Sequence, residues 1–153
     1  MISLSKKPKM RIGVDLHGVL DKNPEMSRLI LKALMDAGHA IFVISGPPSF
    51  EIIKSLKDLG LKLQTHYTSW FSIVDFLQRR NVEMWKDDKD TWWANDKDWW
   101  SSKAEMAKIL ELDVMIDNSE EYAEYFEDID TKFFLFTDKV SEMIEKGYSI
   151  YTE

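Results

Sequence analysis

Short apolar runs alternate along the chain with longer segments whose apolar residues recur every three or four positions. Residues 10–15 (MRIGVD) and 40–45 (AIFVIS) are continuous apolar runs, typical of strands that are buried on both faces. Between them, residues 23–39 begin with an Asn-Pro pair, repeat apolar residues at helical spacing and stop at a glycine, which predicts a helix. Strand, helix and strand in this order form a βαβ unit, so we expect the two strands to be parallel.

The same alternation continues to the end of the chain. It predicts helices over 49–60, 70–81, 101–112 and 119–128, strands over 61–69, 113–118 and 131–138, and a short helix with a tail over 142–153. Alternating elements of this kind predict an α/β fold, a doubly wound, Rossmann-like parallel sheet of about five strands with helices on both faces. The whole chain, 1–153, is expected to form one domain, because its length suits one core better than two.

One stretch, residues 82–100, follows neither a helical nor a strand period. In it, VEMW and TWW flank a polar DDKD segment, which suits a small β-hairpin. The stretch holds five closely spaced tryptophans, Trp85, Trp92, Trp93, Trp99 and Trp100. Their rings can form a lid that stacks on a nucleobase or another flat group, or a satellite core that holds the hairpin against the sheet. Packing is the more common role of such clusters.

Composition narrows the class of protein. A formal net charge of −7 argues against a nucleic-acid partner, which normally meets a basic surface, but it leaves room for a small anionic ligand. The absence of cysteine excludes disulfides, zinc-thiolate sites and thiol nucleophiles. The first apolar run is interrupted by an aspartate and no run is long enough to cross a bilayer, so we expect a cytoplasmic protein without a secretory signal or a membrane partner.

Polar residues follow three of the expected strands. Asp15, Ser45 and Asp117 each close an apolar run, and His66 falls near the end of the strand predicted over 61–69. The carboxyl ends of parallel strands share one edge of the sheet, and ligands of doubly wound folds bind there. A single aspartate at a strand end commonly caps the next turn. The convergence of several such residues is therefore what indicates a site.

Four short segments, in order, resemble the motifs of the haloacid dehalogenase-like (HAD) phosphohydrolase superfamily. They are DLHG at 15–18, SG at 45–46, Lys103, and DN at 117–118. The family pattern is DxDG after the first strand, Ser or Thr after the second, Lys at the start of a later helix, and an acidic cluster after the fourth strand. The resemblance runs from residue 10 to about 138. The stretch 82–100 falls where larger members carry a cap domain and is too short for one, which implies a capless member.

The resemblance implies a Mg²⁺-dependent phosphomonoesterase that acts on a small phosphate ester, such as a nucleotide, through an aspartyl-phosphate. In that arrangement Asp15 is the nucleophile, since a carboxylate can attack phosphorus. A phosphate dianion is repelled by a carboxylate unless a hard cation intervenes, and such a cation prefers oxygen ligands. The implied metal ligands are Asp15, the backbone carbonyl of His17, Asp117 and Asn118.

The resemblance also implies that Ser45, Gly46 and Lys103 bind the phosphate, with the hydroxyl and the following amides holding its oxygens. Lys103 falls in the first turn of its predicted helix, where a cation opposes the helix dipole and an incoming anion would remove the conflict. The alternatives are a simple turn serine and an ordinary exposed lysine, with Lys97 or Lys108 as the functional cation.

Two positions depart from the family pattern. His17 stands where the family has a second aspartate as general acid and base, a role that an imidazole can fill because it exchanges a proton near neutral pH. Asn118 stands where many members have another aspartate, and a neutral amide weakens metal binding. These departures leave an alternative open: a catalytically silent HAD-like module that binds a phosphate, a nucleotide or a protein.

Overall fold

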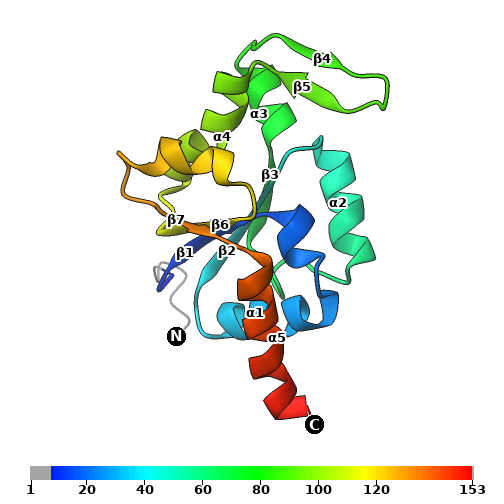
Figure 1. Cartoon of the computed structure of the whole chain (residues 1–153), viewed down its shortest axis with the longest axis vertical. Coiled ribbons are helices and arrows are strands. Elements are labelled where there is room, and N and C mark those ends of the chain that lie inside the picture. The colour runs from blue at the N-terminus through cyan, green and yellow to red at the C-terminus, as the bar shows by residue number, and fades with distance from the viewer. Residues whose placement is uncertain (1–7, 153) are drawn as a thin grey trace, which may run out of the picture.

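The fold centres on a five-stranded parallel sheet with strand order β3-β2-β1-β6-β7, seen in a computed structural model that describes residues 8–152 (Figure 1). Residues 1–7, which belong to the segment considered for a secretory signal, lie outside the described residues. The strands are β1 Arg11–Val14, β2 Ala40–Ser45, β3 Ser69–Ser72, β6 Val114–Asp117 and β7 Lys132–Leu135. The predicted α/β class and doubly wound parallel sheet are confirmed.

Helices cover both faces of the sheet. The helices are α1 Pro24–Asp36, α2 Ser49–Asp58, α3 Ile73–Arg79, α4 Asp96–Leu110, α5 Asp138–Thr152 and the 3-10 helix η2 Glu120–Phe126. A turn, η1 Leu16–Leu20, follows β1, and its backbone is not helical at His17 and Gly18. One apolar core joins the sheet to α3, α4 and η2, and a second joins its other face to η1, α1 and α2. This arrangement leaves the carboxyl ends of the strands as the edge where loops from both layers meet.

The first βαβ unit follows the sequence closely. Asn23 caps α1, because its Oδ1 accepts a hydrogen bond from the Met26 amide at 3.1 Å, and a proline occupies the first helical position. β1 lies at the centre of the sheet and pairs in parallel with β2 on one side and β6 on the other. The strand predicted over 10–15 therefore ends one residue earlier, and Asp15 is the first residue beyond it.

The third strand was predicted in the wrong place. It is β3, Ser69–Ser72, and not residues 61–69, which form turns with one isolated bridge between Leu63 and Tyr67. Leu61 and Tyr67 are buried in these turns and imitate the alternation of a strand. The helix predicted from residue 70 begins after the Ser72 cap instead.

The shift of β3 also decides the place of His66. The residue precedes β3, so it lies toward the amino-terminal edge of the sheet and away from the strand ends that carry Asp15. It is buried there, and its Nδ1 accepts a hydrogen bond from the Lys62 amide at 2.9 Å. Burial, followed by the cations of Arg28 and Lys62, lowers the pKa of His66. The residue stabilises a turn.

The stretch 82–100 holds the predicted hairpin, made of β4 Met84–Lys86 and β5 Trp92–Ala94 (Figure 1). Its last part is helical, because α4 begins at Asp96 and not at residue 101. Asn95 caps that helix by accepting a hydrogen bond from the Asp98 amide at 2.9 Å. Lys103 consequently lies in the second turn of α4, and the predicted conflict with the helix dipole at the first turn is wrong.

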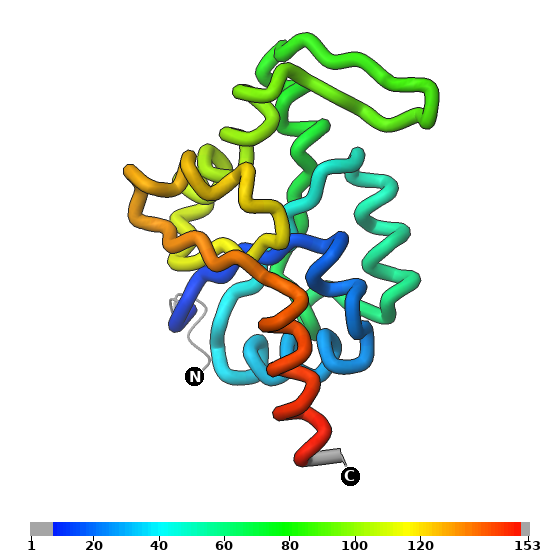
Figure 2. Tube along the Cα trace, viewed as in Figure 1, coloured from blue at the N-terminus to red at the C-terminus, as the bar shows by residue number. Residues whose placement is uncertain are grey.

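The end of the chain differs in detail from the prediction. Residues 119–128 contain the 3-10 helix η2, and the last strand is shorter than residues 131–138. The expected short terminal helix is α5, fifteen residues long, which runs away from the sheet toward the carboxyl terminus (Figure 2). Among the described residues, no helix has both the length and the apolar character that crossing a bilayer requires.

Candidate active site

The register of two central strands brings two aspartates side by side. Val14 of β1 pairs with Ile116 of β6, so Asp15 and Asp117 are the next residues along each strand. The Asp15 amide donates a hydrogen bond to the Ile116 carbonyl at 2.9 Å, which extends the pairing by one step. Both carboxylates therefore emerge at the carboxyl edge of the sheet, where ligands of this fold class bind.

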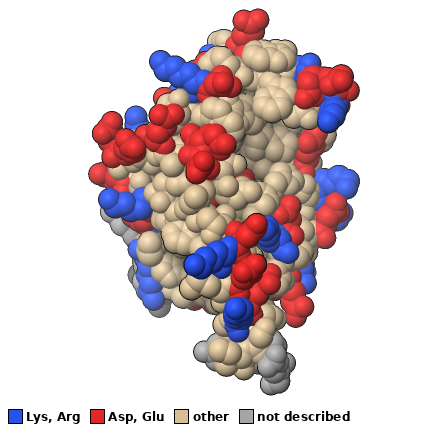
Figure 3. Space-filling view, in the orientation of Figure 1, with Lys and Arg blue, Asp and Glu red and all other residues tan. Residues whose placement is uncertain are grey.

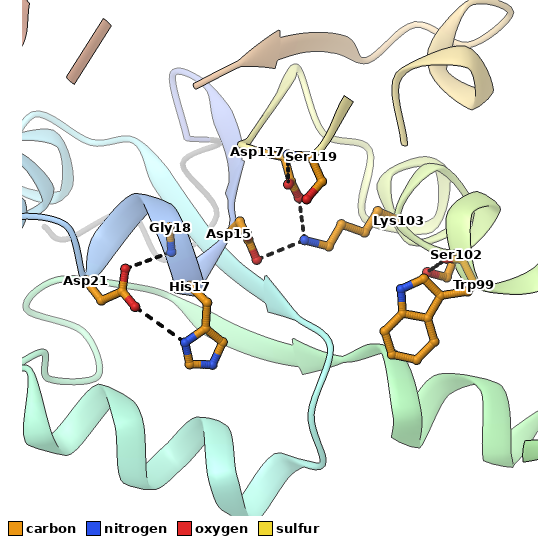
Figure 4. A network of polar contacts seen from close by, with 9 residues as sticks. All are labelled: Asp15, His17, Gly18, Asp21, Trp99, Ser102, Lys103, Asp117 and Ser119. Atoms are coloured by element: carbon orange, nitrogen blue, oxygen red, sulfur yellow. Dashed lines mark hydrogen bonds and ion pairs between the residues drawn. The ribbon is translucent and has the colours of Figure 1, made fainter. Parts of the chain in front are cut away.

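Lys103 reaches from α4 into the space between these carboxylates (Figure 4). Its Nζ lies 3.0 Å from Asp15 Oδ1 and also donates to Asp117 Oδ2. Asp117 is fully buried, Lys103 is 1% exposed and Asp15 is 8% exposed. The alternative that Lys103 is an ordinary exposed lysine is thereby excluded, and the neighbouring Lys97 and Lys108 are exposed instead.

The cluster of Asp15, Lys103 and Asp117 combines two carboxylates with one ammonium group, so it carries an excess negative charge. Burial raises the pKa of Asp15 above its usual value, Lys103 acts against this rise, and Asp117 adds to it. Burial by itself lowers the pKa of Lys103, but the two carboxylates and Tyr122 together hold it above its ordinary value. Lys103 therefore stays protonated, and a second positive charge would stabilise the two carboxylates further.

Tyr122 closes the cluster from η2, although no pattern in the sequence singled it out. The Lys103 Nζ lies 4.6 Å from the centroid of the Tyr122 ring, a cation–π contact. Trp100 packs edge-on against the same ring at 4.8 Å between centroids. Burial raises the pKa of Tyr122 to about 12, although Lys103 counteracts the shift. The tyrosine is thus a neutral wall for the buried ammonium group.

The turn after Asp15 has a shape that only glycine permits at its centre. Gly18 has φ +85°, and a Cβ atom at this position would lie 2.0 Å from the Asn118 Nδ2. The Asn118 amide therefore lies against Gly18, so the first and last motif segments meet in space as well as in sequence order. The close approach of Asn118 is a physical reason for a glycine at position 18, two residues before the buried Leu20.

His17 belongs to the same turn but faces solvent. Its side chain is 54% exposed, and its Nδ1 lies 3.5 Å from Asp21 Oδ2. The other oxygen of Asp21 accepts a hydrogen bond from the Gly18 amide at 2.7 Å, so one carboxylate holds both the turn and the ring (Figure 4). Asp21 escaped the sequence analysis, although a spacing of four residues from His17 was a signal for a contact.

Ser45 and Gly46 end β2 at the same edge of the sheet. The Ser45 Oγ is buried and has no hydrogen-bond partner among residues 8–152. A buried hydroxyl without a partner is costly, and a phosphate oxygen would supply the missing acceptor. Gly46 lies against Trp99, since a Cβ atom at position 46 would be 3.1 Å from the indole ring. Neither simple turn chemistry nor packing satisfies the Ser45 hydroxyl.

The donors fit a hard divalent cation, although the described residues do not build a complete cage. Within that part of the chain, no three His, Cys, Asp or Glu side chains cluster closely enough to hold a metal ion. Asp15 and Asp117 supply two carboxylates with an excess negative charge, and the carbonyl of His17 and the amide of Asn118 are further oxygen donors nearby in the sequence. Mg²⁺ is commonly held by one or two carboxylates together with water and substrate phosphate, which matches this sparse set.

Two hollows flank the cluster. One, about 500 Å³, lies between Gly18, Asn118 and the loop from β7 to α5, and the ion pair of Lys22 with Asp138 lines it. The other, about 480 Å³, lies between the loop that follows Ser45 and the tryptophan hairpin. Both volumes suit a small-molecule group. Figure 3 shows acidic side chains gathered over η2, beside the first hollow.

Comparison with known proteins supports the fold. No family model and no curated protein matches the chain. A solved structure of an uncharacterized protein from Corynebacterium glutamicum is similar to it, with a TM-score of 0.54 and 17% sequence identity, covering 90% of this chain and 91% of the other. At 17% sequence identity, this similarity shows only that the two proteins share a fold. The chain is a Rossmann-like α/β protein with a five-stranded parallel sheet.

Proposed function

We propose that the protein is a Mg²⁺-dependent phosphomonoesterase of the HAD-like type, acting on a small phosphate ester. The observation that carries the proposal is the buried Lys103, which bridges Asp15 and Asp117 at the carboxyl ends of adjacent parallel strands. Burying three charges is expensive, and a purely structural core would be served better by apolar residues. A cluster of this kind at the ligand-binding edge of the sheet favours a catalytic role.

The first step is a displacement at phosphorus. A carboxylate oxygen of Asp15 forms a bond to phosphorus, the bond from phosphorus to the ester oxygen breaks, and the leaving alkoxide takes a proton from His17. The chain itself contributes the charge and hydrogen bonds that phosphate needs. Lys103 supplies a permanent positive charge beside the attacking group, and the Ser45 hydroxyl supplies a donor that lacks a protein partner.

The second step returns the enzyme to its starting state. Water attacks phosphorus while His17 accepts its proton, and the bond between phosphorus and Asp15 breaks to release inorganic phosphate. The exposed position of His17 suits this role, because the imidazole must meet both the leaving alcohol and incoming water. Asp21 orients the ring through its Nδ1, which leaves Nε2 for proton transfer.

A magnesium ion would be held by Asp15, Asp117, the carbonyl of His17 and Asn118. When bound, it supplies positive charge that offsets the repulsion between the phosphate and the two carboxylates. These residues suit the ion because two carboxylates, Asp15 and Asp117, share the single ammonium group of Lys103. Asn118 contributes no charge of its own, so we expect weaker metal binding than in a site with three carboxylates.

The test is a screen of phosphate esters with Mg²⁺ for release of inorganic phosphate. We expect release that chelation of the metal stops and that Asp15→Asn reduces to background, with a smaller loss in His17→Ala. The matched control is Asp113→Asn. Asp113 directly precedes β6, at the end of the strand opposite to Asp117, and its Oδ2 accepts a hydrogen bond from the Arg11 amide at 2.8 Å. Full activity in Asp15→Asn would contradict the proposal.

A second candidate is a catalytically silent module that binds phosphate without turnover. Two departures from the family pattern favour it: His17 replaces the family's acid, and the neutral Asn118 stands where many members have another aspartate. The screen separates the candidates, since binding of phosphate without release from any ester supports the module. His17→Asp sharpens the answer, because a silent protein that gains activity lacked only its acid, whereas an active protein that loses activity used the imidazole.

A further inference from the structure

We propose that the alcohol part of the substrate carries a planar aromatic ring and that the tryptophan pocket, formed by Trp93, Trp99 and the loop after β2, holds this ring. The inference rests on the proposed function, which it extends to the class of substrate. A nucleobase and a simple aryl group share the required chemistry, which is a flat π-face attached to a phosphate ester.

The tryptophan pocket is continuous with the proposed phosphate position. Gly46 lines the pocket and follows Ser45, whose buried hydroxyl lacks a partner among the described residues. Trp99 lies one helical turn before Lys103 on α4 (Figure 4). Its ring also lies against Gly46. A phosphate held by Ser45 and Lys103 would therefore place its ester group beside the Trp99 ring.

The indole of Trp93 is held in place without being buried. Its Nε1 donates a hydrogen bond to Asp87 Oδ2 at 2.7 Å, and the other oxygen of Asp87 accepts from the amides of Lys89 and Thr91. The bond with Trp93 also lowers the pKa of the Asp87 carboxyl, so the carboxylate is ionised and remains an acceptor. An exposed aromatic face that is fixed in orientation loses little entropy when a flat ligand stacks on it.

Trp93 and Trp99 present a shared aromatic wall. Their rings lie 6.4 Å apart between centroids with an interplanar angle of 40°, and Trp93 keeps 43% of its surface exposed. The pocket volume, about 480 Å³, accommodates a ring of nucleobase size. Of the tryptophans, Trp99 and Trp100 pack against the core, whereas Trp93 is exposed and is the one that the proposal assigns to a ligand.

The charges around the two hollows favour the tryptophan pocket for the ring. The other hollow is lined by Lys22, Glu120, Glu121 and Asp138, which suit solvent or polar groups better than a flat apolar face. Charged side chains also line the tryptophan pocket, namely Glu51, Lys89 and Asp90, but four indole rings and Val74 give it an apolar surface that the other hollow lacks. This apolar surface suits a flat ring.

The experiment compares phosphate release from adenosine 5′-monophosphate, 4-nitrophenyl phosphate and the ring-free ribose 5-phosphate. For the wild type we expect higher kcat/KM with the ring-bearing esters. In Trp93→Ala the ratio of ring-bearing to ring-free kcat/KM should fall roughly tenfold, the size expected when one stacking platform is removed. Trp93→Phe should keep most of the ratio. Preference for the nucleotide over 4-nitrophenyl phosphate identifies a nucleobase as the natural ring, and the reverse identifies an aryl group.

The matched control is Trp85→Ala. Trp85 pairs across the hairpin with Trp93, is 50% exposed and does not line the tryptophan pocket, so its removal should leave the ratio unchanged. Equal ratios in the wild type, Trp93→Ala and Trp85→Ala would overturn the inference while the phosphatase proposal stands. Calorimetric binding of adenosine 5′-monophosphate and ribose 5-phosphate to Asp15→Asn tests the tryptophan pocket separately from phosphatase activity. Tighter binding of the ring-bearing ester that Trp93→Ala weakens supports the pocket, even where no ester is hydrolysed. Equal affinity for the two esters overturns the inference.

Discussion

Two ionisable side chains, Asp15 and His17, follow the same strand, β1, and have opposite environments. Asp15 pairs with Lys103, and their side chains are 11% and 2% exposed. His17 lies beside Asp21, and their side chains are 54% and 38% exposed. A buried ion pair is held firmly, because separating its members leaves a charge without compensation, whereas an exposed pair contributes little and rearranges easily.

The difference suggests a division of labour within one turn. Under the proposed function, the buried cluster would fix the positions of the groups that meet phosphorus, and preorganised charge of this kind is effective because it needs no rearrangement during a reaction. The exposed pair of His17 and Asp21 is the part of the turn that the proposed proton transfer between substrate and water would use. Each of the following variants perturbs one side of this comparison.

The largest effect is expected for Lys103→Met, which leaves two buried carboxylates without their cation. The free energy of unfolding should fall by about 3–5 kcal/mol, as for other broken buried pairs, and phosphate release should be lost. Denaturant unfolding measures the change, with the exposed Lys108→Met on the same helix as control. If both variants unfold at the same denaturant concentration, Lys103 is not a buried partner of the carboxylates.

Tyr122→Phe tests the aromatic wall of the buried cluster through pH. The pKa of Tyr122 is raised to about 12 from 10.0, so the folded protein keeps this proton over a range in which the unfolded chain loses it. The contribution of this proton to the free energy of unfolding is complete below pH 10 and is lost as pH rises toward 12. The loss amounts to roughly 2–3 kcal/mol, because one pKa unit corresponds to about 1.4 kcal/mol.

The measurement is urea unfolding below pH 10 and near pH 12, where Tyr122→Phe should lose less stability than the wild type. Tyr125→Phe on the same 3-10 helix is the control, because this tyrosine is only half-buried. An equal loss in the wild type and in Tyr122→Phe would show that the Tyr122 hydroxyl does not titrate in this range.

Gly18→Ala links the two regions, because position 18 lies between the exposed His17 ring and Asn118, which directly follows the buried Asp117. The positive φ and the 2.0 Å approach of Asn118 should together lower the free energy of unfolding by roughly 1–2 kcal/mol. Thermal unfolding checks this against Gly147→Ala, a helical position with open space around it. A neutral Gly18→Ala would mean that the turn adapts without strain.

The smallest change in stability is expected for Asp21→Asn. The amide oxygen still accepts the hydrogen bond of Gly18, and the contact with the half-exposed His17 is weak, so the free energy of unfolding should change by less than about 1 kcal/mol. Phosphate release should nevertheless slow, since the carboxylate that orients the ring is gone. Stability and kcat measured on the same sample distinguish these effects, and unchanged kcat would argue against a positioning role.

Much of the architecture could be predicted, and the errors have local causes. The strands around Asp15, Ser45 and Asp117 are continuous apolar runs, which leave little choice of structure. The third strand was misplaced because the buried Leu61 and Tyr67 imitate a strand within turns. The start of α4 was missed because its first turn contains Trp99, which packs on Gly46 through contacts invisible in the sequence.

The sequence by itself determined the order of the elements, the parallel sheet and the edge at which Asp15, Ser45 and Asp117 emerge, because hydrophobic periodicity and turn residues act locally. Only the tertiary structure decided that Lys103 is buried between two carboxylates, that Tyr122 covers it, and that His17 stays in solvent. Burial and the pairing of charges depend on packing between segments far apart along the chain, and no local pattern carries that information.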